Sequence, residues 1–275
     1  MPTVHEIVNQ LPEPDDRGLY SQIDENIVDR VIALLQQGGR ESLLALIDMI
    51  KEPGNHEDYK AHYALHCLAV EVCKATGDRK RRRFAETLAS QIGGQRPKAV
   101  QKYLVQQLQV AGRREVAGTL GALLTDEELC EPAAQALTAI REGALAQFRK
   151  ALAKAKGKCR LTIIQNLGVL QDDRSVVALR QGLKDSDPEM RIAAGWALGN
   201  VGDSGSWELL CQAAKSSKGW ERIQMTKACL LLAEKYVEQG KKNEAKKIYQ
   251  QLRETLKDSS DHYVQEVLLT ALHGI

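Results

Sequence analysis

The sequence predicts an all-α protein, a right-handed superhelix of about seven helical hairpins that follow one leading helix. Three observations lead to this fold class. Similar segments recur every 29–31 residues, Gly, Pro and Asp divide the chain into lengths suited to short helices, and no segment sustains the apolar–polar alternation of a strand. A hairpin of two short helices cannot bury its apolar face alone, so neighbouring hairpins are expected to stack.

The expected helices are short, and residues that favour turns bound each of them. Residues 1–20 have little helical periodicity and are expected to form a polar arm. The helices follow at 24–37, 40–51, 57–76, 79–92, 96–111, 113–124, 128–141, 143–155, 158–170, 173–184, 187–201, 204–216, 219–239, 241–257 and 260–273. Residues 21–275 then form a single repeat domain, with a longer hairpin at 220–257.

The clearest repeat unit is DSDPEMRIAAGWALGNVGD, residues 185–203. It has an Asp cap, an early Pro, an Arg, a run of small residues, and a closing Gly-Asp turn. The small residues let neighbouring helices approach closely. Counting back from the leucine of this unit gives the matching positions of successive repeats: Leu198, Leu167, Leu137, Leu108 and Leu68.

This pattern resembles the HEAT-repeat family, in particular the short repeats first noted in phycobilin lyases. The resemblance is strongest over 158–216 and extends to 113–157 and 219–275. Near the C-terminus, Tyr236 and Ala245 are spaced as in one tetratricopeptide unit. HEAT arrays serve mainly as scaffolds, so the resemblance implies a non-enzymatic protein-interaction module that binds a protein or peptide in its concave groove.

In HEAT arrays the second helix of each hairpin lines the concave face. In the clearest unit Ile192, Trp196 and Asn200 are spaced i, i+4, i+8 and share one ridge. Shifting this register along the chain gives the full predicted concave ridge: His62, His66, Lys102, Gln106, Gln135, Gln165, Ile192, Trp196, Asn200 and Lys227. Trp is enriched at binding hot spots, so we expect Trp196 to be an anchor, with packing against the next repeat as the alternative. Trp207 and Trp220 are expected to pack.

Basic residues are concentrated in one stretch of a nearly neutral chain. The formal net charge is +2, but residues 1–58 carry −8, and residues 74–114 hold 11 basic against two acidic side chains. Five successive basic residues open a helix, at the end where the macrodipole disfavours them: Arg79, Lys80, Arg81, Arg82 and Arg83. The alternative function is therefore nucleic-acid or polyanion binding through 79–114. The competing interpretation is a solvated face balanced by the acidic N-terminal region.

The sequence offers no catalytic constellation, metal site or cofactor site that we predict to be functional. Its histidines His62 and His66 lie on one helix face, but no spaced acidic third ligand accompanies them. The dyads His5-Glu6 and His56-Glu57 do not match the helix positions of the di-iron ligands in deoxyhypusine hydroxylase, a HEAT-repeat enzyme. The six cysteines are too sparse for a disulfide scaffold and are expected to be mostly buried thiols. A second alternative is an accessory module of a larger enzyme.

Composition restricts the partners further. Hydrophobic residues make up 43% of the chain and aromatic residues 4%, which is ordinary for a globular protein whose core consists of aliphatic side chains. No apolar run is long enough for a membrane helix, and the N-terminus lacks a signal-peptide pattern. We expect a monomer without a membrane partner, cytoplasmic as written, or exported if the chain is a module of a longer protein.

Overall fold

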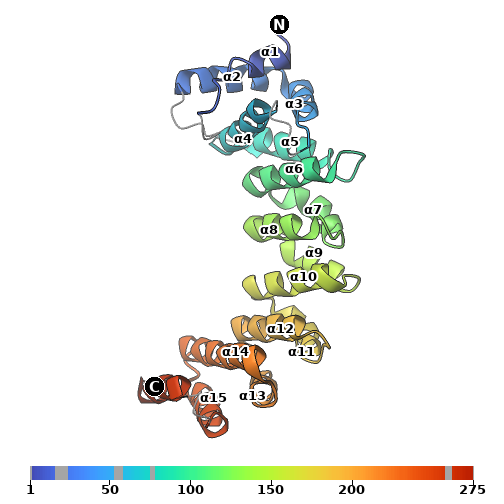
Figure 1. Ribbon diagram of the computed structural model, residues 1–275. Helices are drawn as coiled ribbons and strands as arrows, with labels where there is room; N and C mark the ends of the chain where they lie inside the picture. The colour runs from blue at the N-terminus through green and yellow to red at the C-terminus, as the bar shows by residue number, and fades with distance from the viewer. Residues whose placement is uncertain (1, 16–23, 53–57, 75–77, 258–261, 275) are drawn as a thin grey trace. The chain divides into compact units, whose positions relative to one another are not determined.

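The computed structural model describes residues 2–15, 24–52, 58–74, 78–257 and 262–274, and its regular structure is helical throughout (Figure 1). The helices are α1 (Val4–Val8), α2 (Glu25–Gln37), α3 (Gly39–Asp48), α4 (Tyr59–Lys74), α5 (Asp78–Ala89), α6 (Lys98–Ala111), η1 (Arg114–Val116), α7 (Ala117–Leu123), α8 (Cys130–Ile140), α9 (Ala144–Leu152), α10 (Gly157–Val169), η2 (Asp173–Ser175), α11 (Val176–Gly182), α12 (Pro188–Val201), α13 (Trp207–Ser216), α14 (Gly219–Glu238), α15 (Lys242–Thr255) and α16 (His262–Gly274). No strand occurs in these described ranges, so the predicted all-α class is confirmed.

The chain forms two compact units, Met1–Gln147 and Phe148–Ile275, and the division falls within α9. We call them unit 1 and unit 2. In both, a helix pair packs against the pair that follows it in sequence. The second helices of these pairs contact each other in series, α4 with α6 and α6 with α8 in unit 1, and α10 with α12 and α12 with α14 in unit 2.

The first residues of unit 1 are more ordered than the polar arm that we predicted from them. Residues Val4–Val8 form α1, whose N-cap is a capping box: Thr3 Oγ1 accepts from the Glu6 backbone N–H at 3.2 Å, and the Thr3 N–H donates to Glu6 at 2.8 Å. Ile7, Val8 and Leu11 are buried, and α1 contacts α2, α3 and α4. The apolar side chains were too few to show periodicity, but they are enough to hold one short helix against its neighbours.

The leucines that we used to set the repeat register are all in the core. Leu68 and Leu108 are buried in unit 1, as is Leu137 on α8, while Leu167 and Leu198 are buried in unit 2. Each lies on the second helix of its pair. The register predicted from the sequence is therefore confirmed at these positions.

Small residues set how closely the second helices of unit 2 approach each other. A Cβ added at Gly168 of α10 would lie 2.8 Å from the Cα of Ala197 on α12, and one added at Gly199 would lie 2.8 Å from the backbone oxygen of Ala228 on α14. Real Cβ atoms do not approach other heavy atoms this closely, so glycine is needed at both crossings. Ala194 makes the same kind of close approach to Gly182 of α11.

Two successive turns of unit 2 are held by the same polar network, repeated 31 residues apart. At the first turn, Arg149 donates to Asp172 Oδ1 at 2.5 Å and the Ser175 hydroxyl donates to Oδ2 at 2.5 Å. At the second, Arg180 is paired with Asp203, and the Ser206 hydroxyl donates to the same carboxylate at 2.5 Å. In each network the Arg lies on a first helix and the Asp lies in the turn after the second helix of the same pair. The Ser lies at the start of the next pair.

Two first helices differ from the single helices that we expected. Residues 113–124 and 173–184 each begin with a 3₁₀ turn, η1 and η2, before the α-helix continues. At η2 the Ser175 hydroxyl bonds to Asp172 three residues earlier, which favours the tighter turn. Near the C-terminus, α14 and α15 pack together, and Tyr236, Ala245 and Tyr249 are buried.

Candidate functional site

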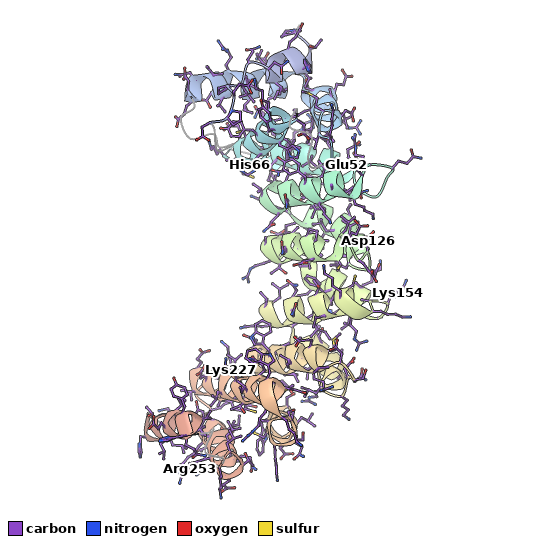
Figure 2. The ribbon with its side chains drawn as sticks, viewed as in Figure 1. Glu52, His66, Asp126, Lys154, Lys227 and Arg253 are labelled. Carbon is purple, nitrogen blue, oxygen red and sulfur yellow. The ribbon has the colours of Figure 1, made fainter. Side chains whose placement is uncertain are left out.

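The second helices of unit 2 present a mixed apolar and polar surface to solvent. Side chains from α10, α12 and α14 compose it, and we call it the second-helix face: Gln165, Val169, Ile192, Trp196, Asn200, Trp220, Ile223 and Lys227. Gln165, Trp196 and Lys227 are exposed, whereas Ile192 and Asn200 are half-buried. All five predicted ridge residues of unit 2 therefore lie on second helices and reach the surface. Figure 2 labels Lys227 on α14.

Trp196 both packs against a neighbouring helix and remains exposed, which are the two alternatives that the sequence left open. Its side chain packs across the preceding second helix, because a Cβ added at Gly168 would lie 2.8 Å from the ring carbon Cζ3 of Trp196. The residue nevertheless keeps 37% of its surface exposed. Asn200 donates to the backbone oxygen of Trp196 at 3.1 Å, one turn further along α12. The indole is thus supported from one side and available to a partner from the other.

Trp220 does not pack as we predicted. It is the second residue of α14 and is 60% exposed. Lys227 lies two turns along α14 with its ammonium nitrogen 6.0 Å from the centroid of the Trp220 ring, at the outer limit of a cation–π contact. Ile223, between them, is 49% exposed. Trp207, by contrast, packs against the core as expected.

The predicted ridge residues of unit 1 lie on α4, α6 and α8, and its histidines serve contacts between helices. His62 Nε2 lies 3.1 Å from an oxygen of Asp58, and the ring meets Tyr103 of α6 edge-on at 4.1 Å. His66, labelled in Figure 2, is hydrogen-bonded through Nδ1 to Gln107 at 3.0 Å. Further ridge members are the half-buried Lys102 and the exposed Gln106 and Gln135.

The described residues contain no group of three side chains able to hold a metal ion. The dyad His56-Glu57 lies outside the described residues. Four of the six cysteines are buried, while Cys67 is half-buried and Cys73 is exposed. In the same described ranges no helix has both the length and the apolar character needed to cross a membrane.

The basic run on α5 separates into structural and exposed members. Arg81 is 3% exposed and donates at 2.6 Å to Asp78, to Glu115 and to the backbone oxygen of Ala111. The hydrogen bond with Asp78 raises the pKa of Arg81, so this guanidinium stays charged inside the fold. Asp78 also places a negative charge at the N-terminus of α5, which offsets the unfavourable position of the basic run.

The other members of the run reach solvent. Arg82 pairs with Glu86 one turn on, at 2.8 Å. Arg79, Lys80 and Arg83 are exposed and form no ion pair within the described ranges. The helical period explains the separation, because it points Arg81 inward while its neighbours point outward. Three of the five consecutive basic residues are thus exposed cations without an ion-pair partner in the described ranges.

Consecutive helix pairs, small residues at the crossings and a turn network with a 31-residue repeat define the class of this chain: an α-helical repeat protein. Residues 145–230 match the model of the family described as HEAT repeats, so the resemblance inferred from the sequence is confirmed over this region. The matched region contains both Asp–Arg–Ser networks and Trp196. No curated protein matches the sequence.

Solved structures are similar to the whole chain at low identity. One is the crystal structure of an engineered protein, with 17% sequence identity, coverage of 98% of this chain and 77% of that chain, and a TM-score of 0.49. Another is the complex of CpcE and CpcF of phycocyanin lyase from Nostoc sp. PCC7120, with 15% identity, coverage of 93% and 96%, and a TM-score of 0.39.

Sequence reasoning missed two features of these surfaces. One is the exposure of Trp220. The prediction for this residue was wrong because a Trp at the start of a helix was expected to pack. The other is the turn network, for which the sequence did carry a signal: Arg149, Asp172 and Ser175 recur 31 residues later as Arg180, Asp203 and Ser206.

Proposed function

We propose that this chain is a non-enzymatic protein-interaction module that binds a segment of a partner protein on the second-helix face of unit 2. The observation that carries the proposal is the exposure of Trp196 on a surface where Val169, Ile223 and Trp220 are exposed as well. Monomeric proteins seldom leave adjacent large apolar side chains open to water without a binding role. HEAT repeats, which residues 145–230 match, are generally interaction modules.

The chemistry of the face indicates the kind of segment that would fit. Trp196 is held by its contact at Gly168, so little side-chain entropy is lost when a partner packs against it. Lys227 supplies a positive charge beside the apolar groups. The expected partner segment therefore carries at least one bulky apolar side chain and a carboxylate near it, with the apolar contact giving affinity and the charge giving orientation.

The test compares the wild-type protein with Trp196→Ala and with Leu209→Ala as bait for partners from the native organism's lysate. Leu209 is the matched control, because it is 39% exposed on α13, a first helix. The captured partner is then identified, and its binding segment is measured by calorimetry against all three proteins. We expect W196A to weaken binding by about 2 kcal/mol or more, roughly thirtyfold, and L209A to leave it unchanged.

Other outcomes would contradict the proposal. A partner whose affinity is the same for W196A and wild type does not use this face. Nucleic acid recovered at low salt, lost at high salt and indifferent to W196A would move the function to the exposed cations of α5, since counterion release makes such binding steeply salt-dependent. A catalytic complex that contains the chain and retains its full activity with W196A would favour the accessory-module alternative.

A further inference from the structure

Unit 1 contains a pocket of about 700 Å³ between α2, α3, α4 and α5. This volume falls within the range of small-molecule sites, roughly 300–1,000 Å³. The pocket is lined by residues of unit 1 alone and the second-helix face by residues of unit 2 alone, so different variants test the two sites.

The floor of the pocket is apolar. Leu35 comes from α2, Leu43 from α3, Leu68 and Val72 from adjacent turns of α4, and Phe84 from α5. Each of these residues is at most 7% exposed. They provide an apolar surface on which an aliphatic or aromatic body could lie, and burial of that body would supply most of the affinity.

The rim of the pocket is basic. Lys80 and Arg83 line it from one face of α5, where Phe84 and Thr87 continue the same i, i+3, i+4, i+7 series. Arg40, at the start of α3, is a third lining cation. None of these three cations has an ion-pair partner within the described ranges, and all are exposed.

Glu86 is the acidic residue of the lining, and its charge is already compensated. Arg82 donates to its carboxylate at 2.8 Å from the side of α5 that faces solvent. The Thr87 hydroxyl donates to the backbone oxygen of Arg83 at 2.8 Å, so it is satisfied within its own helix. The rim therefore keeps a net positive charge next to an apolar floor, which is the arrangement that an amphipathic anion complements.

From this arrangement we propose that unit 1 has a binding site for a small amphipathic anion, a molecule with an apolar body of ring or short-chain size and one terminal carboxylate, sulfonate or phosphate group. The apolar body lies on Leu43, Val72 and Phe84, and the anionic group meets Lys80, Arg83 and Arg40. A polyanion such as nucleic acid fits less well, because the apolar floor offers no partner to a chain of phosphates.

The test uses anilinonaphthalene sulfonate as the probe, an apolar aryl body with one sulfonate. Phenyl-naphthylamine, which has the same aryl body without the charge, is the matched neutral ligand. Binding is followed by fluorescence and calorimetry. We expect one site per chain, with the sulfonate at least about tenfold tighter than the neutral ligand, the size expected for charge-assisted hydrogen bonds.

The variants separate the charge from the cavity. Lys80→Gln with Arg83→Gln should weaken sulfonate binding about tenfold and leave the neutral ligand unaffected. The control is Arg79→Gln with Arg114→Gln, which removes the same charge from exposed residues that do not line the pocket. Val72→Phe, which fills the floor, should abolish binding of both ligands, and circular dichroism checks that this variant folds.

Any of the following results would overturn the proposal: equal affinity for the charged and neutral ligands, equal effects of the K80Q/R83Q and R79Q/R114Q pairs, or loss of sulfonate binding in W196A. The last result would assign the probe to the second-helix face. Because K80Q/R83Q changes only exposed side chains, the charge test stands even if V72F does not fold. Tighter binding of single-stranded DNA than of the sulfonate, lost in the same pair, would favour a polyanion site and also overturn the proposal.

Discussion

The Asp203 carboxylate shows how much of this fold depends on single side chains. It pairs with Arg180 of α11 and accepts from the Ser206 hydroxyl at 2.5 Å. The Tyr236 hydroxyl of α14 donates to the backbone oxygen of Asp203 at 3.2 Å. Three helices of unit 2 are thereby tied to one turn. Burial acts to raise the pKa of Asp203, but the hydrogen bonds from Ser206 and Arg180 outweigh it, so the pKa is lowered.

Replacing Asp203 by Asn should therefore destabilise unit 2. The variant keeps the shape of the side chain but leaves Arg180 without its counter-charge, and we expect a loss of about 2–4 kcal/mol in the free energy of unfolding at neutral pH. The control is Asp173→Asn, an exposed carboxylate in η2, whose effect should stay within about 0.5 kcal/mol. Urea unfolding followed by tryptophan fluorescence measures both.

The same substitution predicts a pH dependence. A carboxylate whose folded-state pKa is depressed contributes stability above its unfolded-state pKa, about 3.9, and loses that contribution as the pH falls through the folded-state value. The stability difference between wild type and D203N should therefore be full at neutral pH and shrink below about pH 4. A difference that stays constant into the acid range would show that the Asp203 charge is not what stabilises the turn.

At the scale of helices, the packing of second helices depends on residues without side chains. Gly168 lies where α10 approaches α12, and a Cβ added there would lie 2.8 Å from the Cα of Ala197 and 2.8 Å from the ring carbon Cζ3 of Trp196. Gly168→Ala should push the two helices apart and cost about 1–3 kcal/mol of stability, as overpacking does. It should also change the emission of Trp196. The matched control is Gly118→Ala in α7, where an added Cβ meets nothing within 4 Å; it should be neutral or stabilise by up to about 1 kcal/mol.

If G168A and G118A have equal effects, close approach is not what requires the glycine in α10. If G168A destabilises the protein but leaves tryptophan emission unchanged, the contact between Gly168 and the Trp196 ring is not present in solution. Thermal melts followed by circular dichroism measure the stability of the two variants. Emission spectra of the folded variants measure the change in tryptophan emission.

The helices and their order could be predicted from the sequence because turn residues and buried leucines recur with one period. The exposed ridge on α10 and α12 followed from the same period. The sequence could not show which member of the basic run is buried, because residues 79–83 are all basic. Only the packing of α5 against α6 and η1 distinguishes Arg81. The pocket was equally invisible, because it joins Leu35, Leu43 and Phe84 from a region whose repeat register was too weak to align.

At the scale of the whole molecule, the distribution of tryptophan makes the two units separately observable. The chain has three tryptophans, Trp196, Trp207 and Trp220, and all lie in unit 2. Fluorescence therefore reports on unit 2, whereas helical circular dichroism reports on both units. In a repeat protein each hairpin packs mainly against its neighbours in sequence, so stability is a sum of local terms and a local loss need not spread through the chain.

This predicts that core truncations in the two units give different signatures. Leu104→Ala in unit 1 and Leu198→Ala in unit 2 each remove a side chain that is 0% exposed, at a cost of about 2–5 kcal/mol. In urea, L104A should split or broaden the circular dichroism transition and leave the fluorescence midpoint in place. L198A should lower the fluorescence midpoint and change only part of the dichroism transition. If L104A lowers the fluorescence midpoint as much as L198A does, the chain unfolds as one cooperative body, and a perturbation in the pocket of unit 1 would then also reach the second-helix face of unit 2.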